Sequence, residues 1–278
     1  MSITTSNPLP RELADGLYWL GACYAVPVGG RSLHANNSVF LVAGSKWSAL
    51  VEAGISWDTR TILQQIRDLT EARGLPPLRY VFVTHSEQAH SAGVGHLLAH
   101  HAEASAHGDV TDLHMVFPEH LERMRFADPG DRFDLGGREI LVVEGLFRDL
   151  ITTRWFWDSG SRALFTGDGI SYGHYHTDSA CGMCIEEAEL VDVPQQMKFF
   201  GVSAFHWTKF VDIEPYADRL DEIVFGELHA ELVLPTHGLP VTDPAATMPK
   251  IREGLIAMSH STRLDSDAAF DIFVPEDG

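Results

Sequence analysis

Cysteines, basic residues and long apolar runs are all scarce in this sequence of 278 residues. Three cysteines, an odd number, do not suggest a disulfide framework. The 20 basic residues are outnumbered by 39 acidic ones, and the net charge of −19 argues against binding to nucleic acid or to an anionic membrane. No apolar stretch approaches the roughly 20 residues that span a bilayer. The N-terminal stretch lacks the basic and apolar regions of a secretion signal, so we expect a cytoplasmic protein.

Apolar residues, by contrast, are plentiful. They make up 45% of the chain, and aromatic residues 10%, which is enough for a sizeable packed core. We find no internal repeat, low-complexity tract or linker. The sequence therefore predicts one domain over residues 1–278, with its core between about residues 16 and 260.

Hydrophobic periodicity predicts strands and helices that alternate in blocks. β-rich apolar runs predict strands at 17–26, 37–44, 48–54, 78–85, 138–145, 153–160, 162–169 and 231–238. Helical spacing predicts helices at 57–73, 92–103, 185–200, 215–230 and 244–259. This order indicates an α/β fold in which two sheets form a sandwich flanked by helices.

Three of these predicted strands end in residues that can bind a metal. The segment VFVTHSEQAH sets His85, Glu87 and His90 within six residues, FTGDG ends in Asp168, and PTHG carries His237. Imidazole and carboxylate groups together suit zinc, iron or manganese, and loops at strand ends are well-supported places for them. The sequence therefore predicts a metal site, although an alanine stands at position 89 between two of the candidate ligands.

These segments resemble the signature motifs of the metallo-β-lactamase superfamily. THSEQAH is similar to its motif T-H-x-H-x-D-H, and LVEAG, FTGDG and PTHG resemble its other signature segments in the same order. Glu87 in place of the second histidine is similar to the flavodiiron branch, as are the stretches NNSVFLV and GHYHTDSACGMCIEEAEL. The resemblance covers about residues 16 to 260. It implies a metallo-β-lactamase-like αββα sandwich of two mixed β-sheets flanked by helices.

The resemblance also implies a site for two iron ions, with zinc or manganese as alternatives. Carried over by position, the first ion would be bound by His85, Glu87, Asp149 and Asp168, and the second by His90, His237 and the shared Asp168. The chain departs from the family pattern at two of the ligand positions. Ala89 replaces an aspartate, which leaves the second site weaker or open, and Asp149 stands where flavodiiron domains carry a histidine. A different alignment would put Phe147, which cannot bind a metal, at that position.

Several further residues are candidates for secondary roles. His174 and His176 follow Asp168 and would either fill the open metal position or donate a proton, unless they are surface histidines of a polar loop. His34 lies in a segment whose family counterpart approaches the metals. Cys181 and Cys184 form a C-x-x-C pair, which suits redox exchange or metal binding but also two packed free thiols.

The favoured function is a non-haem diiron protein that binds or activates O₂ or NO. It would be either a stand-alone oxygen-binding or reductase-like protein, or an oxygenase of a small-molecule substrate. Flavodiiron reductases carry a flavodoxin domain, and no flavin-binding loop is visible here, so a reductase would need a separate electron-donor protein. The alternatives are a metal-dependent hydrolase of thioesters, lactones or phosphoesters, and a degenerate member with one metal or no catalysis. Homodimerisation remains open.

Overall fold

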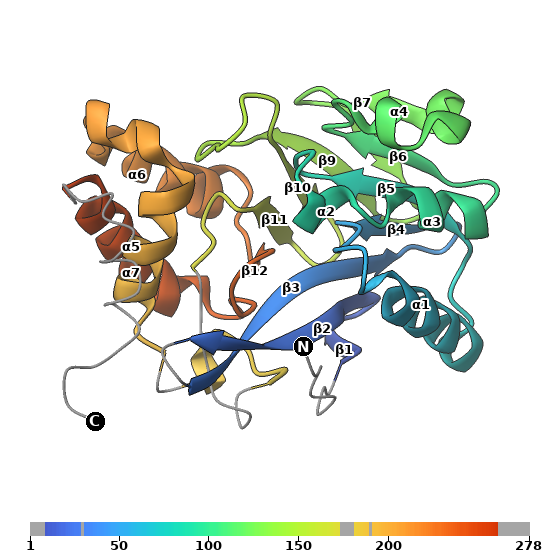
Figure 1. The fold of residues 1–278 in the computed structure, drawn as a ribbon, viewed down its shortest axis with the longest axis horizontal. Helices are drawn as coiled ribbons and strands as arrows, with labels where there is room; N and C mark the ends of the chain where they lie inside the picture. The colour runs from blue at the N-terminus through green and yellow to red at the C-terminus, as the bar shows by residue number, and fades with distance from the viewer. Residues whose placement is uncertain (1–8, 29–30, 173–180, 189–190, 261–278) are drawn as a thin grey trace.

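Two β-sheets pack face to face, and helices cover the outer sides of the sandwich (Figure 1). The computed structural model describes residues 9–28, 31–172, 181–188 and 191–260. Both sheets mix parallel and antiparallel strands. The predicted αββα sandwich is confirmed, because the two apolar sheet faces meet inside and the helices shield the rest.

The larger sheet has seven strands in the order of the sequence. They are β1 (Arg11–Ala14), β2 (Leu17–Val28), β3 (Arg31–Ala43), β4 (Ser48–Val51), β5 (Leu78–Val83), β6 (Ser105–Gly108) and β7 (Met124–Phe126). Strands β1 to β4 run antiparallel, and β4 to β7 run parallel. The carboxyl ends of β4, β5 and β6 therefore lie at one edge of the sheet.

The smaller sheet has five strands in the order β12-β11-β10-β9-β8. They are β8 (Arg132–Asp134), β9 (Glu139–Glu144), β10 (Arg154–Asp158), β11 (Ala163–Gly167) and β12 (Leu232–Pro235). Only the β11–β12 pair is parallel, so these two strands also deliver their carboxyl ends to one edge.

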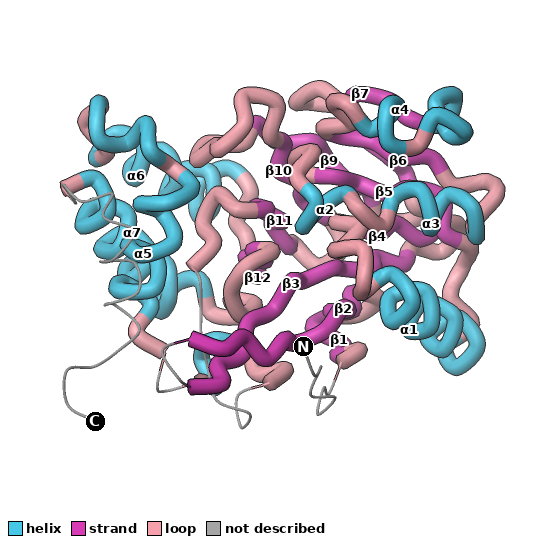
Figure 2. The backbone as a smooth tube through the Cα atoms, in the orientation of Figure 1, coloured by secondary structure: helices cyan, strands magenta, loops and turns pink. Residues whose placement is uncertain are grey.

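The helices fall into two groups on opposite sides of the sheets (Figures 1 and 2). The first group is α1 (Thr59–Arg73), α2 (Gln88–Ser91), α3 (Val94–His100), α4 (Leu113–Val116) and the 3₁₀ helix η1 (Pro118–Arg123). The second is α5 (Val193–Ala204), α6 (Glu214–Asp221) and α7 (Pro244–Ser259), with the 3₁₀ helices η3 (Ile185–Glu187) and η4 (His206–Phe210) and the π-helical turn η5 (Glu222–Glu227).

Alternate residues of the strands face different cores. In β3, Phe40 and Val42 pack into the core between the sheets, while Val39 and Leu41 pack under α1 and α3. Successive side chains of a strand point to opposite faces, so a strand buried on both sides reads as a continuous apolar run. This explains why the segment VFLVA is apolar throughout.

The predicted helix boundaries differ from the structure in two places. The stretch 185–200 contains a short 3₁₀ helix and then α5, which begins only at Val193, because Asp192 caps it by accepting a hydrogen bond from Gln195 N–H at 3.1 Å and Pro194 lies in its first turn. The stretch 92–103 yields only α3. It begins after Gly93 and ends at His100, ahead of the short strand β6.

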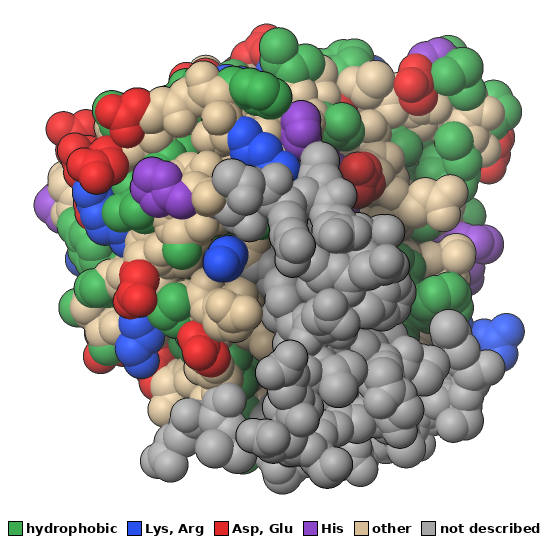
Figure 3. All heavy atoms as spheres, turned by 60° about the vertical axis from the view of Figure 1, so that its left-hand side comes forward, with side chains coloured by type: hydrophobic (Ala, Val, Ile, Leu, Met, Phe, Trp, Pro, Cys, Tyr) green, Lys and Arg blue, Asp and Glu red, His purple; other side chains and the backbone are tan. Residues whose placement is uncertain are grey.

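No helix in the described part of the chain is both long and apolar enough to cross a membrane. On the side that carries the C-terminal helices, acidic, basic and hydrophobic side chains are interspersed over the described surface (Figure 3). Arg252 pairs there with Asp218 at 2.6 Å and Asp221 at 3.0 Å, and Arg219 pairs with Glu227 at 2.5 Å. The few basic residues on this side thus neutralise part of the negative charge of its acidic residues.

Candidate metal centre

Five strand ends from both sheets meet at one edge of the sandwich. The segments after β4, β5 and β6 supply Glu52, His85 and Asp109, and those after β11 and β12 supply Asp168 and His237. All of these strands present their carboxyl ends, because β4 to β6 are parallel to one another and β11 is parallel to β12. The two sheets therefore bring together residues that are up to 185 positions apart.

The turn after β5 is held against the end of β4. Ala53 N–H donates a hydrogen bond to the carbonyl of His90 at 2.8 Å, and Gly93 N–H donates to Gly54 at 3.2 Å. A Cβ atom at Gly93 would lie only 2.1 Å from the carbonyl oxygen of Ala53, so the close approach requires glycine. This packing fixes the backbone from which His85 and His90 project.

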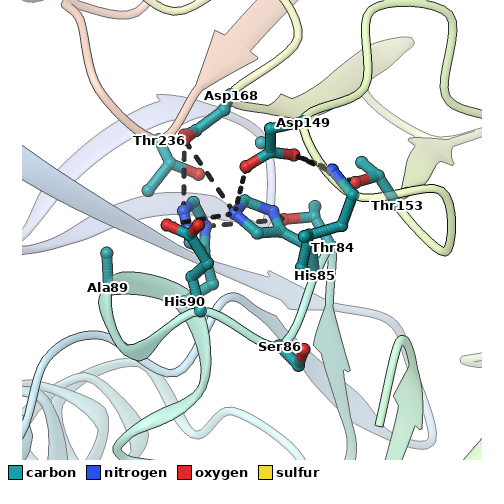
Figure 4. Close-up of polar contacts among 12 residues, drawn as sticks. Thr84, His85, Ser86, Ala89, His90, Asp149, Thr153, Asp168 and Thr236 are labelled. Carbon is teal, nitrogen blue, oxygen red and sulfur yellow. Dashed lines mark hydrogen bonds and ion pairs between the residues drawn. The ribbon is translucent and has the colours of Figure 1, made fainter. Parts of the chain in front are cut away.

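The first group of candidate ligands surrounds His85. Its Nε2 atom lies 3.2 Å from Asp149 Oδ2, 3.9 Å from Asp168 Oδ2 and 4.0 Å from Glu87 Oε2. One ligand atom from each of the four residues lies within 4.8 Å of the others. Figure 4 shows the His85 ring directed toward the carboxylates of Asp149 and Asp168. Glu87 lies at the solvent side, with its side chain 56% exposed.

The second group lies on the other side of Asp168. Asp168 Oδ1 is 3.3 Å from His90 Nε2 and 3.7 Å from His237 Nε2, and the rings of His90 and His237 are 5.5 Å apart. The two oxygens of Asp168 therefore face different groups, Oδ2 toward His85 and Oδ1 toward His90 and His237. One ligand atom each from His85, His90 and Asp168 also lies within 4.8 Å of the others, so Asp168 is within reach of every histidine of the centre.

Three buried atoms in the centre make close ionic contacts but no hydrogen bond of good geometry. They are His85 Nε2, His90 Nε2 and Asp168 Oδ1. Leaving buried polar atoms unpaired is costly, and such atoms call for an explanation such as a bound ion. Imidazole nitrogens and carboxylate oxygens are the donors that first-row transition metals take in proteins. The residues present therefore fit a metal.

A buried hydrogen-bond chain orients the two histidines. Glu52 Oε1 lies 3.1 Å from His90 Nδ1 and accepts from the hydroxyl groups of Thr84 at 2.5 Å and Thr236 at 2.9 Å. Since the Thr84 hydroxyl donates to Glu52, its oxygen is free to accept from His85 Nδ1 at 3.2 Å. With both Nδ1 atoms donating, His85 and His90 turn their Nε2 atoms toward the same space.

Burial and close charges shift the ionisation of the centre. Burial lowers the pKa of His90, but attraction to Glu52 and Asp168 outweighs it and holds that pKa well above its ordinary value. Burial and repulsion from His90 lower the pKa of His85. Burial raises the pKa of Asp168, yet His90 and its neighbouring histidines hold it well below the ordinary range. Burial, then repulsion from Asp149 and Asp168, raises the pKa of Glu87. Crowded carboxylates of this kind favour a cation among them.

Asp149 is presented to the centre by its own loop. Its Oδ1 atom accepts from Leu150 N–H at 2.8 Å and from the Thr153 hydroxyl at 3.2 Å, which leaves Oδ2 for His85. Phe147 is instead fully buried in the core, where its ring packs on Phe205 and Trp207. Of the two alignments, the structure thus places Asp149 and not Phe147 beside the histidines.

Ala89 contributes no ligand atom to the second group. It lies on the α2 turn next to His90 and offers only a methyl group (Figure 4). Its carbonyl oxygen accepts a hydrogen bond from Asn37 Nδ2 at 2.8 Å, which holds the backbone of the turn on β3. The backbone at position 89 is therefore held in place, but the side chain has no carboxylate to bind a metal.

The structure leaves three sequence candidates untested. His34 lies in β3 opposite Ala25, and its side chain is not described. His174 and His176 lie outside the described residues. Their roles stay predictions.

Two supporting residues were not singled out from the sequence. Glu52 has a positive φ of 70° and is buried, and only its place in the segment LVEAG pointed to it. Asp109 Oδ2 accepts from Ser86 N–H at 3.1 Å and from the Thr152 hydroxyl at 2.8 Å. It therefore joins the loop that carries His85 to the loop that carries Asp149, and no motif in the sequence marks it.

Comparison with known proteins gives structural matches only. No family model matches the chain, and no curated protein matches it in sequence. The rubredoxin oxygen:oxidoreductase of Desulfovibrio gigas matches 88% of this chain and 60% of its own, at 13% identity with a TM-score of 0.63. The flavodiiron protein of Giardia intestinalis matches 90% of this chain and 61% of its own, at 13% identity with a TM-score of 0.68. A metallo-beta-lactamase from Pontibacter korlensis matches 90% of this chain and 98% of its own, at 13% identity with a TM-score of 0.58.

The matches therefore span about three fifths of the flavodiiron-type chains and nearly all of the metallo-beta-lactamase. At this level of identity the likeness concerns the fold. This likeness agrees with the resemblance that the sequence motifs show to the metallo-β-lactamase superfamily and its flavodiiron branch. The chain therefore has the metallo-β-lactamase-like fold, which the matched flavodiiron structures also contain.

Proposed function

We propose that the protein is a non-haem diiron protein that binds or activates O₂ or NO. The observation that carries this proposal is the bridging position of Asp168, whose two oxygens face His85 on one side and His90 and His237 on the other. A single metal would need only one of these groups. Two groups that share one carboxylate suit two ions.

The ligand types favour iron over zinc. The first group offers three carboxylates and one histidine, and the second offers two histidines and one carboxylate. Two histidines and one carboxylate with open positions are the ligand type of non-haem iron sites that react with oxygen. Catalytic zinc also takes two histidines and one carboxylate, so the preference for a hard, redox-active ion rests on the three carboxylates of the first group.

The chain's own residues would bind and orient the metals and shape their surroundings. Glu52 and Thr84 hold the histidine rings, while Phe200 of α5 packs 5.8 Å from the His237 ring and closes that side. Ala89 offers no ligand atom beside His90, so a metal bound there would keep a coordination position open for a small molecule. Iron bound here would supply open coordination positions and electrons for O₂ or NO chemistry.

Two forms of this function share the same ligands. In the first, the protein binds or reduces O₂ or NO, and a separate protein supplies the electrons. In the second, it uses O₂ to oxidise a small-molecule substrate. The similarity to a rubredoxin oxygen:oxidoreductase supports the first form.

A zinc-dependent hydrolase is the second candidate. The structural match to a metallo-beta-lactamase supports it, because that match spans nearly the whole of both chains. Against it, Glu87 and Ala89 replace a histidine and an aspartate of the superfamily motif. Hydrolysis would act on a thioester, lactone or phosphoester through a metal-bound water.

The test is to load the protein anaerobically with iron, reduce it, and follow O₂ consumption and the optical spectrum on adding NO. The variant Asp168→Ala serves as the control. The proposal is supported if the wild type reacts rapidly with O₂ or NO and Asp168→Ala does not. No reaction with O₂ or NO, together with turnover of a thioester, lactone or phosphoester by the zinc-loaded protein, contradicts it.

A further inference from the structure

The structure brings together two cysteines that lie far apart in the sequence. Cys23 is in β2, Cys181 begins the described stretch 181–188, and their Sγ atoms are 3.7 Å apart. The contact joins positions separated by 158 residues. The C-x-x-C spacing had pointed instead to Cys181 and Cys184.

Cys184 has a different role in the fold. It caps the 3₁₀ helix η3, where the Glu187 N–H donates to its sulfur and the Cys184 N–H donates to the Glu187 carboxylate at 2.8 Å. Burial raises the pKa of its thiol to about 12. A thiol that stays protonated is a poor nucleophile, so Cys184 is disfavoured as a site of oxidation. Among the described residues, no group of converging metal ligands contains a cysteine.

We propose that Cys23 and Cys181 are a modification site at which a peroxide oxidises the two thiols to a reversible disulfide. Cys181 is half-buried and Cys23 is only 2% exposed, so Cys181 meets the oxidant first. Its thiolate attacks one oxygen of hydrogen peroxide, which gives a sulfenic acid and releases hydroxide. The Cys23 thiol then attacks that sulfur, the S–O bond breaks, and water leaves with the proton of Cys23. Overall, two thiols give two electrons to one peroxide, and two waters form.

The geometry needs only a small adjustment. A disulfide requires a sulfur–sulfur distance of about 2.05 Å, so the two atoms must approach by roughly 1.7 Å. Cys181 lies in a turn beside Gly182, which has a φ of 73°. Rotation of the side chains with a slight shift of this turn supplies the movement, while β2 stays within its sheet.

The bond would reinforce a segment that already links β1 to the loop after His237. Arg11 of β1 donates to the Gly182 carbonyl at 2.8 Å and pairs with Glu187 at 2.6 Å. On the other side, the Glu186 carboxylate accepts from Thr242 N–H and Asp243 N–H, both at 3.0 Å. The segment 181–188 thus links the sheet edge to the loop that follows His237, and the disulfide would add a covalent link to β2.

The test is to treat the folded full-length protein with hydrogen peroxide and map its peptides without reduction. We expect a mass loss of about 2 Da from the two hydrogens removed. We also expect a linked Cys23–Cys181 peptide in the wild type and in Cys184→Ala, and no such peptide in Cys181→Ser. In Cys23→Ser, dimedone should label Cys181 as a trapped sulfenic acid.

Circular dichroism checks that each variant folds. The peptide map of the wild type tests the proposal even if a variant fails to fold. Closing so long a loop should also raise the melting temperature of the oxidised protein by about 5 to 10 °C, reversed by a dithiol reductant. A Cys181–Cys184 link would overturn the proposal. The proposal would also be overturned if the folded wild type kept all three thiols under conditions that oxidise the urea-unfolded chain.

Discussion

The two halves of the candidate metal centre share Asp168 but are built differently. The first half, with His85, Glu87 and Asp149, has more carboxylates, and Glu87 lies largely in solvent. The second half has His90 and His237 and lacks the carboxylate that Ala89 replaces. Its His90, however, is held by a hydrogen bond to the buried carboxylate of Glu52.

The two halves therefore differ in two properties: how many ligands each offers, and how firmly those ligands are held before a metal binds. In the first half, Glu87 is the exposed ligand and must become ordered when a metal binds, whereas His85 and Asp149 are already held by hydrogen bonds. The second takes fewer ligands, and the hydrogen-bonded Glu52 already holds one of them, His90. Ligand number and a preformed geometry both raise affinity, so the halves should differ in how they respond to mutation.

The largest effect should follow the loss of the ligand that both halves share. Asp168→Ala removes Oδ1 from one half and Oδ2 from the other. We expect the metal content to fall from about two ions to well below one per chain, as measured by plasma mass spectrometry. A variant that still holds two ions would show that Asp168 does not bridge.

His90→Ala should affect the halves unequally. It removes a ligand from the second half but none from the first, so about one ion per chain should remain. Plasma mass spectrometry gives the total content, and spectroscopy of the remaining iron identifies the occupied half. Equal loss from both halves would mean that the ligands are assigned wrongly.

Glu52→Gln should weaken the second half without removing a ligand. The amide has the same shape, but its nitrogen cannot accept hydrogen bonds, so the orientation of His90 is less well fixed. Loss of such supporting hydrogen bonds lowers metal affinity by about 10 to 100-fold. Titration of the metal-free protein measures this change, and circular dichroism checks the fold. An affinity loss confined to the first half would count against the hydrogen-bond chain.

Ala89→Asp should strengthen the second half. It restores a carboxylate at a position whose backbone is already held by Asn37, and we expect a tighter second metal by about tenfold, or 1.4 kcal/mol. The same titration measures it. If neither metal content nor O₂ reactivity changes, then position 89 does not face the centre.

The smallest effect on metal content should come from a buried carboxylate outside both halves. Asp58 is only 2% exposed, its Oδ2 atom has no hydrogen-bond partner, and burial raises its pKa to about 7. The folded protein thus holds this proton more tightly than the unfolded chain, and stability is lost as the pH rises from about 4 to about 7.

Asp58→Asn removes this titration. Relative to the wild type, the variant should gain stability between pH 4 and pH 8 by about 2 to 4 kcal/mol, with no change in metal content. Urea unfolding at several pH values measures the difference. A constant difference across this range would show that Asp58 does not titrate as described, and a lost metal would link it to the centre.

The sequence pointed to several of the residues that meet at this edge, because each of them lies in a local pattern. His85, Glu87, Asp168 and His237 each follow an apolar run, and strand ends of this kind deliver side chains to one edge. Glu52 was harder to foresee, since a glutamate after an apolar strand carries no sign of the three hydrogen bonds that bury it. Asp149 followed only from an alignment, because its loop has no distinctive pattern.

In the fold, too, features marked by local residues could be predicted, and those that depend on distant contacts could not. The α7 helix agrees with its predicted range of 244–259, because Asp243 and Pro244 mark its start. The stretch 185–200 is helical at both ends but not continuous, since an apolar pattern alone does not show that Asp192 and Pro194 start a new helix. The contact between Cys23 and Cys181 spans most of the chain, and only the folded structure reveals it.

The most direct test of the diiron proposal is the metal content of untagged protein purified anaerobically from iron-supplemented cells. Two groups of ligands that share Asp168 predict close to two irons per chain, by plasma mass spectrometry. Zinc in place of iron, or a folded protein with no bound metal, would contradict it.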